Sequence, residues 1–495
     1  MRYVSTRDKN VQVSSAEAIV RGLAPDGGLY TPERLPQFPN AWELLQEKTY
    51  AGRAAAIMGM FLSDFSAEEL MGCAEAAYES GRFTGTTPAP VRSVGDGKYV
   101  LELWHGPTAA FKDMALQILP HLLTASLRKC GEERQALILT ATSGDTGKAA
   151  LEGFKDVSGT RVLVFYPEKG VSRIQKLQMV TQTGGNVGVC AVQGNFDDAQ
   201  TSVKKLFADL ALRQRLDEQG MFFSSANSIN LGRLVPQVAY YFSAYCDMMN
   251  QGNIEAGQPI QICVPTGNFG NILAALYAWE MGLPVKKLLC ASNQNNVLTD
   301  FIRQGTYDRR RTFYNTLSPS MDILVSSNLE RALFLLSGGS DALTRDCMYS
   351  LRDIGRYTLP SALMHAFSER IHADFCDDVQ TRETIMEVWR DAGYLLDPHT
   401  AVAYRVAERY RRDTGDNTPV LIASTASPYK FSDAVLQALG ETVEGDGEGL
   451  LERLEKRTQW PVPENLRGLS EKPVQFTQTV CPADMERAVL EIMER

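Results

Sequence analysis

Continuous apolar segments alternate with helical patterns along most of this chain, and this alternation limits the folds it can adopt. The first three apolar segments are residues 136–140, 161–166 and 186–192, and helical periodicity follows them over 146–154, 172–180 and 198–212. The same rhythm returns at residues 260–264, 288–291 and 420–423. Apolar strands that alternate with helices predict parallel sheets covered by helices on both faces. We therefore expect an α/β fold with two parallel-sheet lobes.

Three stretches fall outside this rhythm. Residues 1–90 hold a turn-rich segment, Pro25 to Tyr30, and several helical patterns. Residues from about 300 to 415 are mostly helical in pattern and rich in charge, and the chain from Gly440 onward is acidic with Gly and Pro. The predicted division is an N-terminal domain (1–90), a two-lobe region (91–440) with its smaller lobe at about 130–215, and a C-terminal extension (441–495).

Composition argues against several classes of protein. A net charge of −9 over 495 residues lacks the basic footprint of nucleic-acid binding, although a locally positive pocket can still hold an anionic substrate. Nine cysteines without a CxxC pair and only five histidines argue against a structural zinc site, so we expect no metal. Scattered cysteines and an N-terminus without an apolar core predict a cytoplasmic protein. No apolar run is long enough to cross a membrane.

The densest chemical signal is the segment around Lys112, HGPTAAFKDMALQ, which covers residues 105–117. A Gly-Pro turn precedes Lys112, and a helical pattern with Leu116 and Leu119 on one side follows it. At such a loop-to-helix junction, the helix dipole and partial burial lower the pKa of a lysine and favour the neutral amine that a Schiff base needs. The plain alternative is an ordinary surface lysine in a first helical turn, which the spacing alone favours.

Three further polar loops follow predicted strands. They are TSGDTG (residues 142–147), PTGNFGN (265–271) and STASPYKF (424–431). Glycines and small hydroxyl residues at such turns expose backbone N–H groups that can hold a carboxylate or a phosphate. The plain alternatives are a helix N-cap for the first loop and a Gly/Asn-rich turn for the second. Because each loop lies after a strand, all three can converge on one cleft with Lys112.

The four motifs together resemble those of threonine synthases, which are fold-type-II pyridoxal-phosphate enzymes. The Lys112 segment is similar to the family signature HGPTxAFKDxALQ, and SGDTG, PTGNFGN and TASPYKF occur in the family's order. Residues 22–30, GLAPDGGLY, resemble the family's opening segment. One departure is Ser427, where many relatives have His. This departure bears on substrate positioning and not on cofactor use.

The resemblance implies the two-lobe fold of the tryptophan synthase β-like type and a lyase that acts on phosphate. Its reaction would convert O-phospho-L-homoserine and water to L-threonine and phosphate, the last step of threonine biosynthesis. Lys112 would hold pyridoxal 5'-phosphate and then act as the mobile base. The cofactor-binding residues would be Lys112, Asp145, Gly267, Asn268, Phe269, Gly270, Asn271 and Thr425. In this set the 267–271 loop would bind the cofactor phosphate, and Thr425 would face the pyridine nitrogen.

The same resemblance implies two sets of substrate-binding residues. Those expected at the substrate carboxylate are Thr142, Ser143, Gly144 and Thr146. Candidates for the substrate phosphate, which needs a basic site of its own, are Ser172, Arg173, Lys176, Asn227 and Arg233. The plain alternative for each basic residue is a solvated helix face.

Two other functions remain open at this point. A related phospho-lyase that makes 2-oxobutyrate from the same substrate would share every motif. A non-catalytic relative would be expected to lose the lysine, yet Lys112 is present. We expect a small-molecule substrate, no nucleic acid or membrane partner, and a monomer or homodimer.

Overall fold

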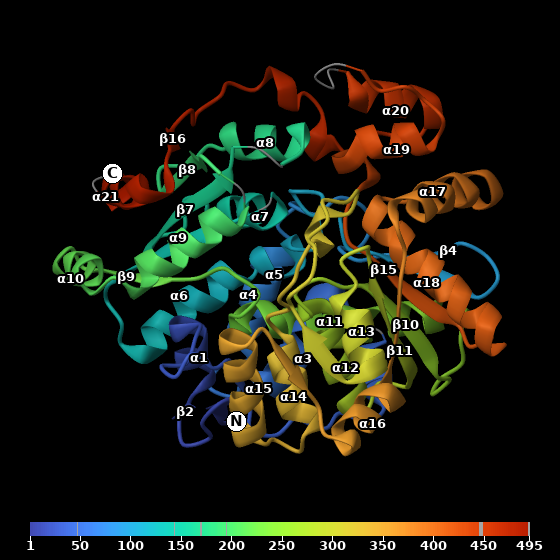
Figure 1. Cartoon of the computed structure of the whole chain (residues 1–495), viewed down its shortest axis with the longest axis horizontal. Helices are drawn as coiled ribbons and strands as arrows, with labels where there is room; N and C mark the ends of the chain where they lie inside the picture. The colour runs from blue at the N-terminus through green and yellow to red at the C-terminus, as the bar shows by residue number, and fades with distance from the viewer. Residues whose placement is uncertain (47, 143, 169–170, 195, 445–448, 494–495) are drawn as a thin grey trace.

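The computed structural model describes residues 1–46, 48–142, 144–168, 171–194, 196–444 and 449–493. A five-stranded sheet and a six-stranded sheet organise the chain, and helices surround both (Figure 1). The α/β fold with two parallel-sheet lobes is confirmed.

The five-stranded sheet is parallel throughout, in the order β16-β8-β7-β6-β9. Its strands are β6 (Gln135–Ala141), β7 (Thr160–Pro167), β8 (Val187–Val192), β9 (Met221–Ser224) and β16 (Thr479–Val480). The first three predicted apolar segments are therefore its three central strands. The sheet also takes a strand beyond residue 215 and one from the C-terminal extension, while the domain boundaries themselves stay a prediction.

Helices of this smaller lobe follow its strands. They are α7 (Asp145–Phe154), α8 (Arg173–Val180), α9 (Phe196–Ala208) and α10 (Leu210–Glu218). The single helical stretch expected over 198–212 is wrong, because the chain breaks at Asp209. The Asp209 carboxylate accepts hydrogen bonds from the backbone N–H groups of Ala211 and Leu212, so it caps a new helix.

The six-stranded sheet has the order β14-β11-β10-β15-β5-β4, and only β4 runs antiparallel to its neighbour. Its strands are β4 (Val91–Ser93), β5 (Lys98–Glu102), β10 (Ile260–Pro265), β11 (Val285–Ser292), β14 (Ile371–Phe375) and β15 (Val420–Ser424). The three later apolar segments are confirmed as β10, β11 and β15. Strand β14 lies at the sheet edge, where a partly polar sequence suffices, and no apolar run predicts it.

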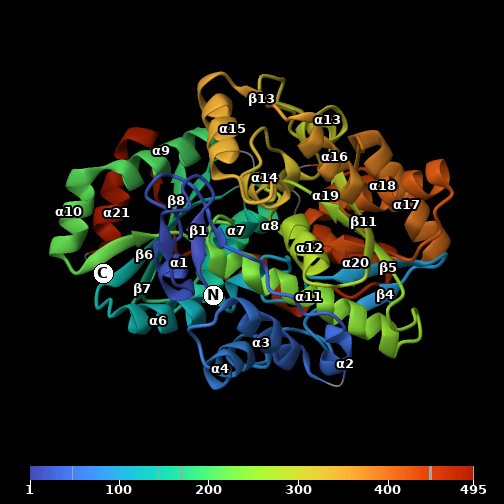
Figure 2. The same cartoon turned by 90° about the horizontal axis from the view of Figure 1, so that it is seen from below.

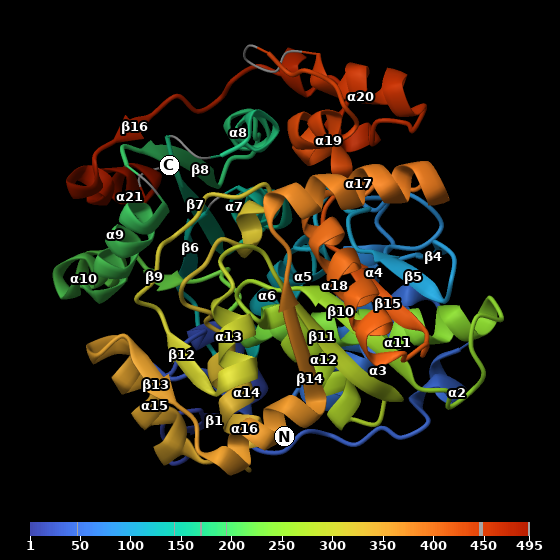
Figure 3. The same cartoon turned by 45° about the vertical axis from the view of Figure 1, so that its right-hand side comes forward.

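Alternate side chains of the central strands pack into two different hydrophobic cores, because successive residues of a strand point to opposite faces of the sheet. Ile262 and Val264 of β10 pack in one core with α11 (Leu231–Asn250) and α12 (Gly270–Glu280). Cys263 between them packs in the other core with α18 (Pro398–Thr414), which lies across β10 and β15 (Figure 3). This double burial explains why the strands are continuously apolar.

The N-terminal part packs beneath the two lobes. It contains a small antiparallel sheet and four helices: β1 (Tyr3–Ser5), β2 (Gln12–Val13), α1 (Ser15–Arg21), β3 (Tyr30–Pro32), α2 (Ala41–Leu45), α3 (Tyr50–Phe61) and α4 (Ala67–Tyr78). Helix α3 contacts the buried helix α11, and α1 contacts α6 (Leu119–Cys130), as Figure 2 shows from below. Helix α6 follows the short α5 (Asp113–Leu116), which begins just after Lys112.

The largely helical stretch expected between 300 and 415 is confirmed, with a small two-stranded antiparallel sheet inside it. Its elements are α13 (Val297–Gln304), β12 (Thr306–Asp308), α14 (Leu329–Leu336), α15 (Asp341–Asp353), β13 (Arg356–Thr358), α16 (Ser361–Arg370) and α17 (Asp378–Ala392). Arg331 of α14 is fully buried and donates hydrogen bonds to the carbonyl oxygens of Tyr30 and Ile229. This guanidinium ties the insertion to the N-terminal part and to the start of α11.

The C-terminal part begins on the larger lobe and ends on the smaller one (Figure 1). Its elements are α19 (Ser432–Ala438), α20 (Leu450–Thr458), the 3-10 turns η3 (Glu464–Leu466), η4 (Leu469–Glu471) and η5 (Pro482–Asp484), and α21 (Met485–Met493). Within the described residues, no helix combines the length and the hydropathy needed to cross a bilayer.

Candidate active site

A cavity of about 2260 Å³ lies where loops from both lobes meet. The predicted residues that line it are Lys112, Thr142, Thr146, Asn227, Arg233, Gly267, Asn268, Phe269, Gly270, Asn271 and Thr425. They come from the segment before α5, from the loops after β6, β9, β10 and β15, and from the first turns of α7, α11 and α12. The parallel strands of each sheet end at the same edge, so these distant segments of sequence converge as predicted.

Lys112 reaches this cavity from the turn before α5. Its side chain is only 11% exposed, and its Nζ lies 3.5 Å from both Asp145 Oδ2 and Ser320 Oγ. Burial lowers the pKa of Lys112, Asp145 opposes that effect, and the positive charges of Lys430 and Arg233 add to it. A lysine in these surroundings loses its proton more easily than one in water, which is what a nucleophilic amine requires.

The loop between β10 and α12 is shaped for close approach of a ligand to the backbone. Phe269 adopts a left-handed conformation with φ of 61°, and α12 begins at the next residue. The exposed backbone N–H groups at the start of α12 favour an anion. At Gly267, an added Cβ would lie 2.6 Å from the carbonyl oxygen of Ser320. Glycine is therefore required at this position to keep the loop against the Ser320 segment.

Two buried donors beside this loop have no hydrogen-bond partner within the described part of the chain. They are Asn271 Nδ2 and Arg233 Nε. The hydroxyl groups of Tyr240 and Tyr241 both donate to Asn271 Oδ1, which orients the amide and leaves its nitrogen unpaired. A buried unpaired donor is costly in water-free surroundings, so both groups fit the oxygens of a bound phosphate. The cavity therefore has two unpaired donors for phosphate oxygens, one at the start of α12 and one at the start of α11.

The loop after β6 serves both as a helix cap and as a cavity wall. Thr142 Oγ1 accepts hydrogen bonds from the N–H groups of Gly144 and Gly147, at 3.0 and 2.9 Å. Thr142 and Thr146 line the cavity, whereas Ser143 lies outside the described residues. Gly144 and Asp145 do not belong to the lining, as far as the described residues go. Asp145 instead contacts the Nζ of Lys112 and accepts a hydrogen bond from Gln175 Nε2.

Thr425 lies directly after β15 and lines the cavity. Its carbonyl oxygen accepts a hydrogen bond from the N–H of Phe111, so it also holds the segment that carries Lys112. The departure at Ser427 is fully buried, and its hydroxyl caps the 3-10 turn η2 (Pro428–Phe431) by accepting from Tyr429 N–H. Ser427 therefore has a local structural role in this chain.

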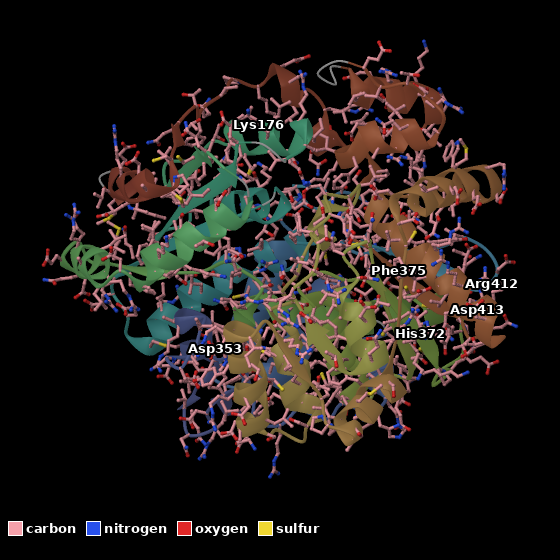
Figure 4. All side chains as sticks on the ribbon, in the orientation of Figure 1. Lys176, Asp353, His372, Phe375, Arg412 and Asp413 are labelled. Atoms are coloured by element: carbon pink, nitrogen blue, oxygen red, sulfur yellow. The ribbon has the colours of Figure 1, made fainter. Side chains whose placement is uncertain are left out.

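The candidates for the substrate phosphate separate into two groups. Asn227 and Arg233 line the cavity, and burial lowers the pKa of Arg233 to about 10. In the described part of the chain, Ser172, Arg173 and Lys176 do not contribute to the lining. Ser172 caps α8 by accepting from Gln175 N–H, and Lys176 is exposed on the same helix (Figure 4). The residue of α8 that contacts the site is Gln175, whose Nε2 donates to Asp145 Oδ1 at 2.9 Å.

Sequence reasoning missed several residues that support this site. His399 lines the cavity, its Nδ1 lies 2.8 Å from Asp397 Oδ1, and its Nε2 accepts the backbone N–H of Ser320 at 3.2 Å. The ring nitrogens are thus assigned, with the proton on Nδ1 facing the carboxylate. The sequence does contain a signal for His399. Asp397-Pro398 is a typical helix start, and the side chain of a histidine in the first helical turn points toward the N-terminal end of the helix, past the N-cap residue.

Comparison with known proteins gives the class to which this site belongs. Residues 85–349 match the family model described as "Pyridoxal-phosphate dependent enzyme". The chain is therefore a pyridoxal-phosphate enzyme, which agrees with the lysine and the phosphate-type donors in the cavity. Residues 2–78 match "Threonine synthase N terminus", and residues 400–489 match "Threonine synthase, C-terminal". The chain belongs to the threonine synthase family.

Individual relatives agree with this membership. Threonine synthase of Pseudomonas aeruginosa is 39% identical over 446 residues, covering 88% of this chain and 90% of that protein. The human protein named "Threonine synthase-like 1" is 42% identical over 455 residues. The alignment covers 88% of this chain but only 60% of the human protein, so this chain spans less than two thirds of that relative.

Solved structures show the same fold along the whole chain. The crystal structure of pyridoxal-phosphate-bound threonine synthase from Brucella melitensis has a TM-score of 0.88 at 34% identity and covers 100% of both chains. The yeast threonine synthase structure has a TM-score of 0.88 at 32% identity, covering 100% of this chain and 98% of that one. The family resemblance expected from the four motifs is confirmed.

Proposed function

We propose that this enzyme converts O-phospho-L-homoserine and water to L-threonine and phosphate. The observation that carries the proposal is the pairing of two anion-binding features in one cavity. One is the start of α12 with the unpaired amide of Asn271, and the other is the buried guanidinium of Arg233 beside Asn227. A substrate with its own phosphate, bound next to a phosphate-bearing cofactor, needs both.

The residues divide the work of this reaction. The start of α12, with Gly267 to Asn271, would hold the cofactor phosphate, and Thr425 would face its pyridine ring. When bound, pyridoxal phosphate supplies an electron sink for charge at the substrate's α-carbon. Lys112 would take up and return protons at the α-carbon, because its buried amine gives up its proton readily.

Substrate recognition would come from the cavity walls. Arg233 and Asn227 would hold the leaving phosphate, since arginine presents a rigid fork suited to phosphate oxygens. Thr142 and Thr146, with the backbone of their loop, would hold the substrate carboxylate. Ser320, fixed by His399, would limit the space around Lys112.

A second candidate is elimination of phosphate from the same substrate to give 2-oxobutyrate. The human relative, which has higher identity than the bacterial threonine synthase, is named "Threonine synthase-like 1", and that name does not specify the product. Water addition at the β-carbon separates the two outcomes, and both need the same lysine and the same phosphate site. The cytoplasmic location and the monomeric or dimeric state expected from the sequence stay predictions.

Product identification tests the proposal. The purified, cofactor-loaded protein is incubated with O-phospho-L-homoserine, and phosphate, threonine and 2-oxobutyrate are measured together. Equal amounts of phosphate and threonine are expected, and Lys112→Ala should give neither. Phosphate with 2-oxobutyrate would establish the second candidate, and no consumption of substrate would reject both.

A further inference from the structure

Lys430 is a second lysine at the site, and its side chain has no exposed surface. It belongs to the turn η2 that follows β15, on the larger lobe. Its Nζ lies 2.7 Å from Asp145 Oδ1 and donates to the carbonyl oxygen of Thr108 at 2.8 Å. Burying an ammonium group is costly unless a partner neutralises it, so Asp145 is what makes this buried charge tolerable.

Asp145 is shared between two lysines. Its Oδ1 accepts from Lys430 and, at 2.9 Å, from Gln175 Nε2. Its Oδ2 lies 3.5 Å from the Nζ of Lys112, which is beyond an ideal charged hydrogen bond. The carboxylate is therefore held on the side of Lys430, and Lys112 has the weaker contact.

The charges around Lys112 come from several elements. Asp145 faces it from α7, Lys430 from η2 and Arg233 from α11. His399 of α18 stands behind Ser320 and binds its N–H. Burial on its own would raise the pKa of Asp145, yet Lys430 and then Lys112 outweigh burial and lower it. Asp145 is thus a carboxylate, and the side chains of two lysines lie against it.

We propose that Lys430 is a positioning residue that engages Asp145 and thereby keeps Lys112 from forming a tight ion pair, so that the Lys112 amine gives up its proton more easily and is more reactive. Without Lys430, Asp145 would have one ammonium partner left and would hold Lys112 in its protonated form. A protonated lysine cannot attack a carbonyl carbon or accept a proton. The inference rests on Lys112 as the reactive amine of the proposed function, and it is independent of which product forms.

The proton affinity of Lys112 provides the test. The full-length protein, freed of cofactor with hydroxylamine, is trace-labelled with acetic anhydride across a pH series, and peptide mapping gives the pKa of Lys112. Lys430→Gln, which removes the charge but keeps a hydrogen-bond donor, should raise that pKa by about one unit. The neutral fraction of Lys112 near pH 7 then falls about tenfold. Lys430→Arg keeps the charge and should restore most of the wild-type value.

A matched control separates this effect from the loss of any buried lysine. Lys98 is 8% exposed and pairs with Glu408 at 3.5 Å, away from the cavity lining among the described residues. Lys98→Gln should therefore leave the titration of Lys112 unchanged. An equal shift in Lys98→Gln and Lys430→Gln would mean that general destabilisation, rather than the shared carboxylate, moves Lys112.

Asp145→Asn tests the same arrangement from the other side. Removing the carboxylate should lower the pKa of Lys112. In the Asp145→Asn background, Lys430→Gln should then shift the pKa of Lys112 by less than half of the shift that Lys430→Gln causes in wild type. A folded Lys430→Gln protein in which Lys112 titrates as in wild type would overturn the proposal. Should Lys430→Gln not fold, Asp145→Asn decides, and an unchanged Lys112 pKa there would also overturn it. Threonine formation is not measured in these titrations, so failure of the proposed function would be seen separately.

Discussion

Replacing Gly267 with alanine tests the loop at residues 267–271, which we propose holds the cofactor phosphate. The added Cβ would lie 2.6 Å from the carbonyl oxygen of Ser320 and 3.4 Å from the Cα of Met321. Ser320 cannot retreat freely, because its N–H donates to His399 Nε2 at 3.2 Å. Overpacking of this kind costs about 1–3 kcal/mol. If the loop takes up that strain when the cofactor binds, the Kd for pyridoxal phosphate rises about 5- to 150-fold.

The assay is a titration of cofactor-free protein with pyridoxal phosphate, followed by visible absorbance, together with thermal unfolding of the cofactor-free form. Gly72, inside α4, is the matched control, because nothing lies within 4 Å of a Cβ added there. Gly72→Ala should leave the Kd unchanged and stabilise the helix by about 0.5–1 kcal/mol. Cofactor binding by Gly267→Ala as tight as that of wild type would refute the reasoning.

Three further predictions follow from the same site. Borohydride reduction of the cofactor-loaded protein should fix the label on Lys112, and peptide mapping that finds it on another lysine would contradict the assignment. Arg233→Ala should cost about 2–5 kcal/mol in kcat/KM for O-phosphohomoserine while the cofactor spectrum stays intact, with Arg233→Lys recovering only part; normal turnover would place the phosphate elsewhere. Burial raises the pKa of Asp113 to about 6 from 3.8, so native stability falls as pH rises from about 4 through 6. The unfolding free energy of Asp113→Asn, measured with urea, should therefore rise by about 3 kcal/mol relative to that of wild type between pH 4 and 7. Parallel pH profiles of the two proteins would argue against this cause.

Local pattern in the sequence was sufficient for most of the elements and for the loops that line the cavity. Apolar runs such as 260–264 predicted strands because burial on both faces leaves no polar positions. The Lys112 segment and the loop at 265–271 were recognisable because a strand end followed by glycine and a helix start can be read from neighbouring residues alone. The family, the two-lobe fold and pyridoxal phosphate were all predicted from these motifs.

Tertiary structure alone decided which side chains meet at the site. Lys430 and Asp145 are far apart in sequence and belong to different lobes, and only the tertiary fold makes these two side chains partners. Residue type alone does not distinguish His399 from the other four histidines, and only the position of α18 brings its ring to the backbone N–H of Ser320. The phosphate candidates Arg233 and Lys176 both lie on helices, yet one faces the cavity and the other faces solvent. Residue type and spacing define what a side chain can do, whereas its partners and its burial depend on how distant segments pack.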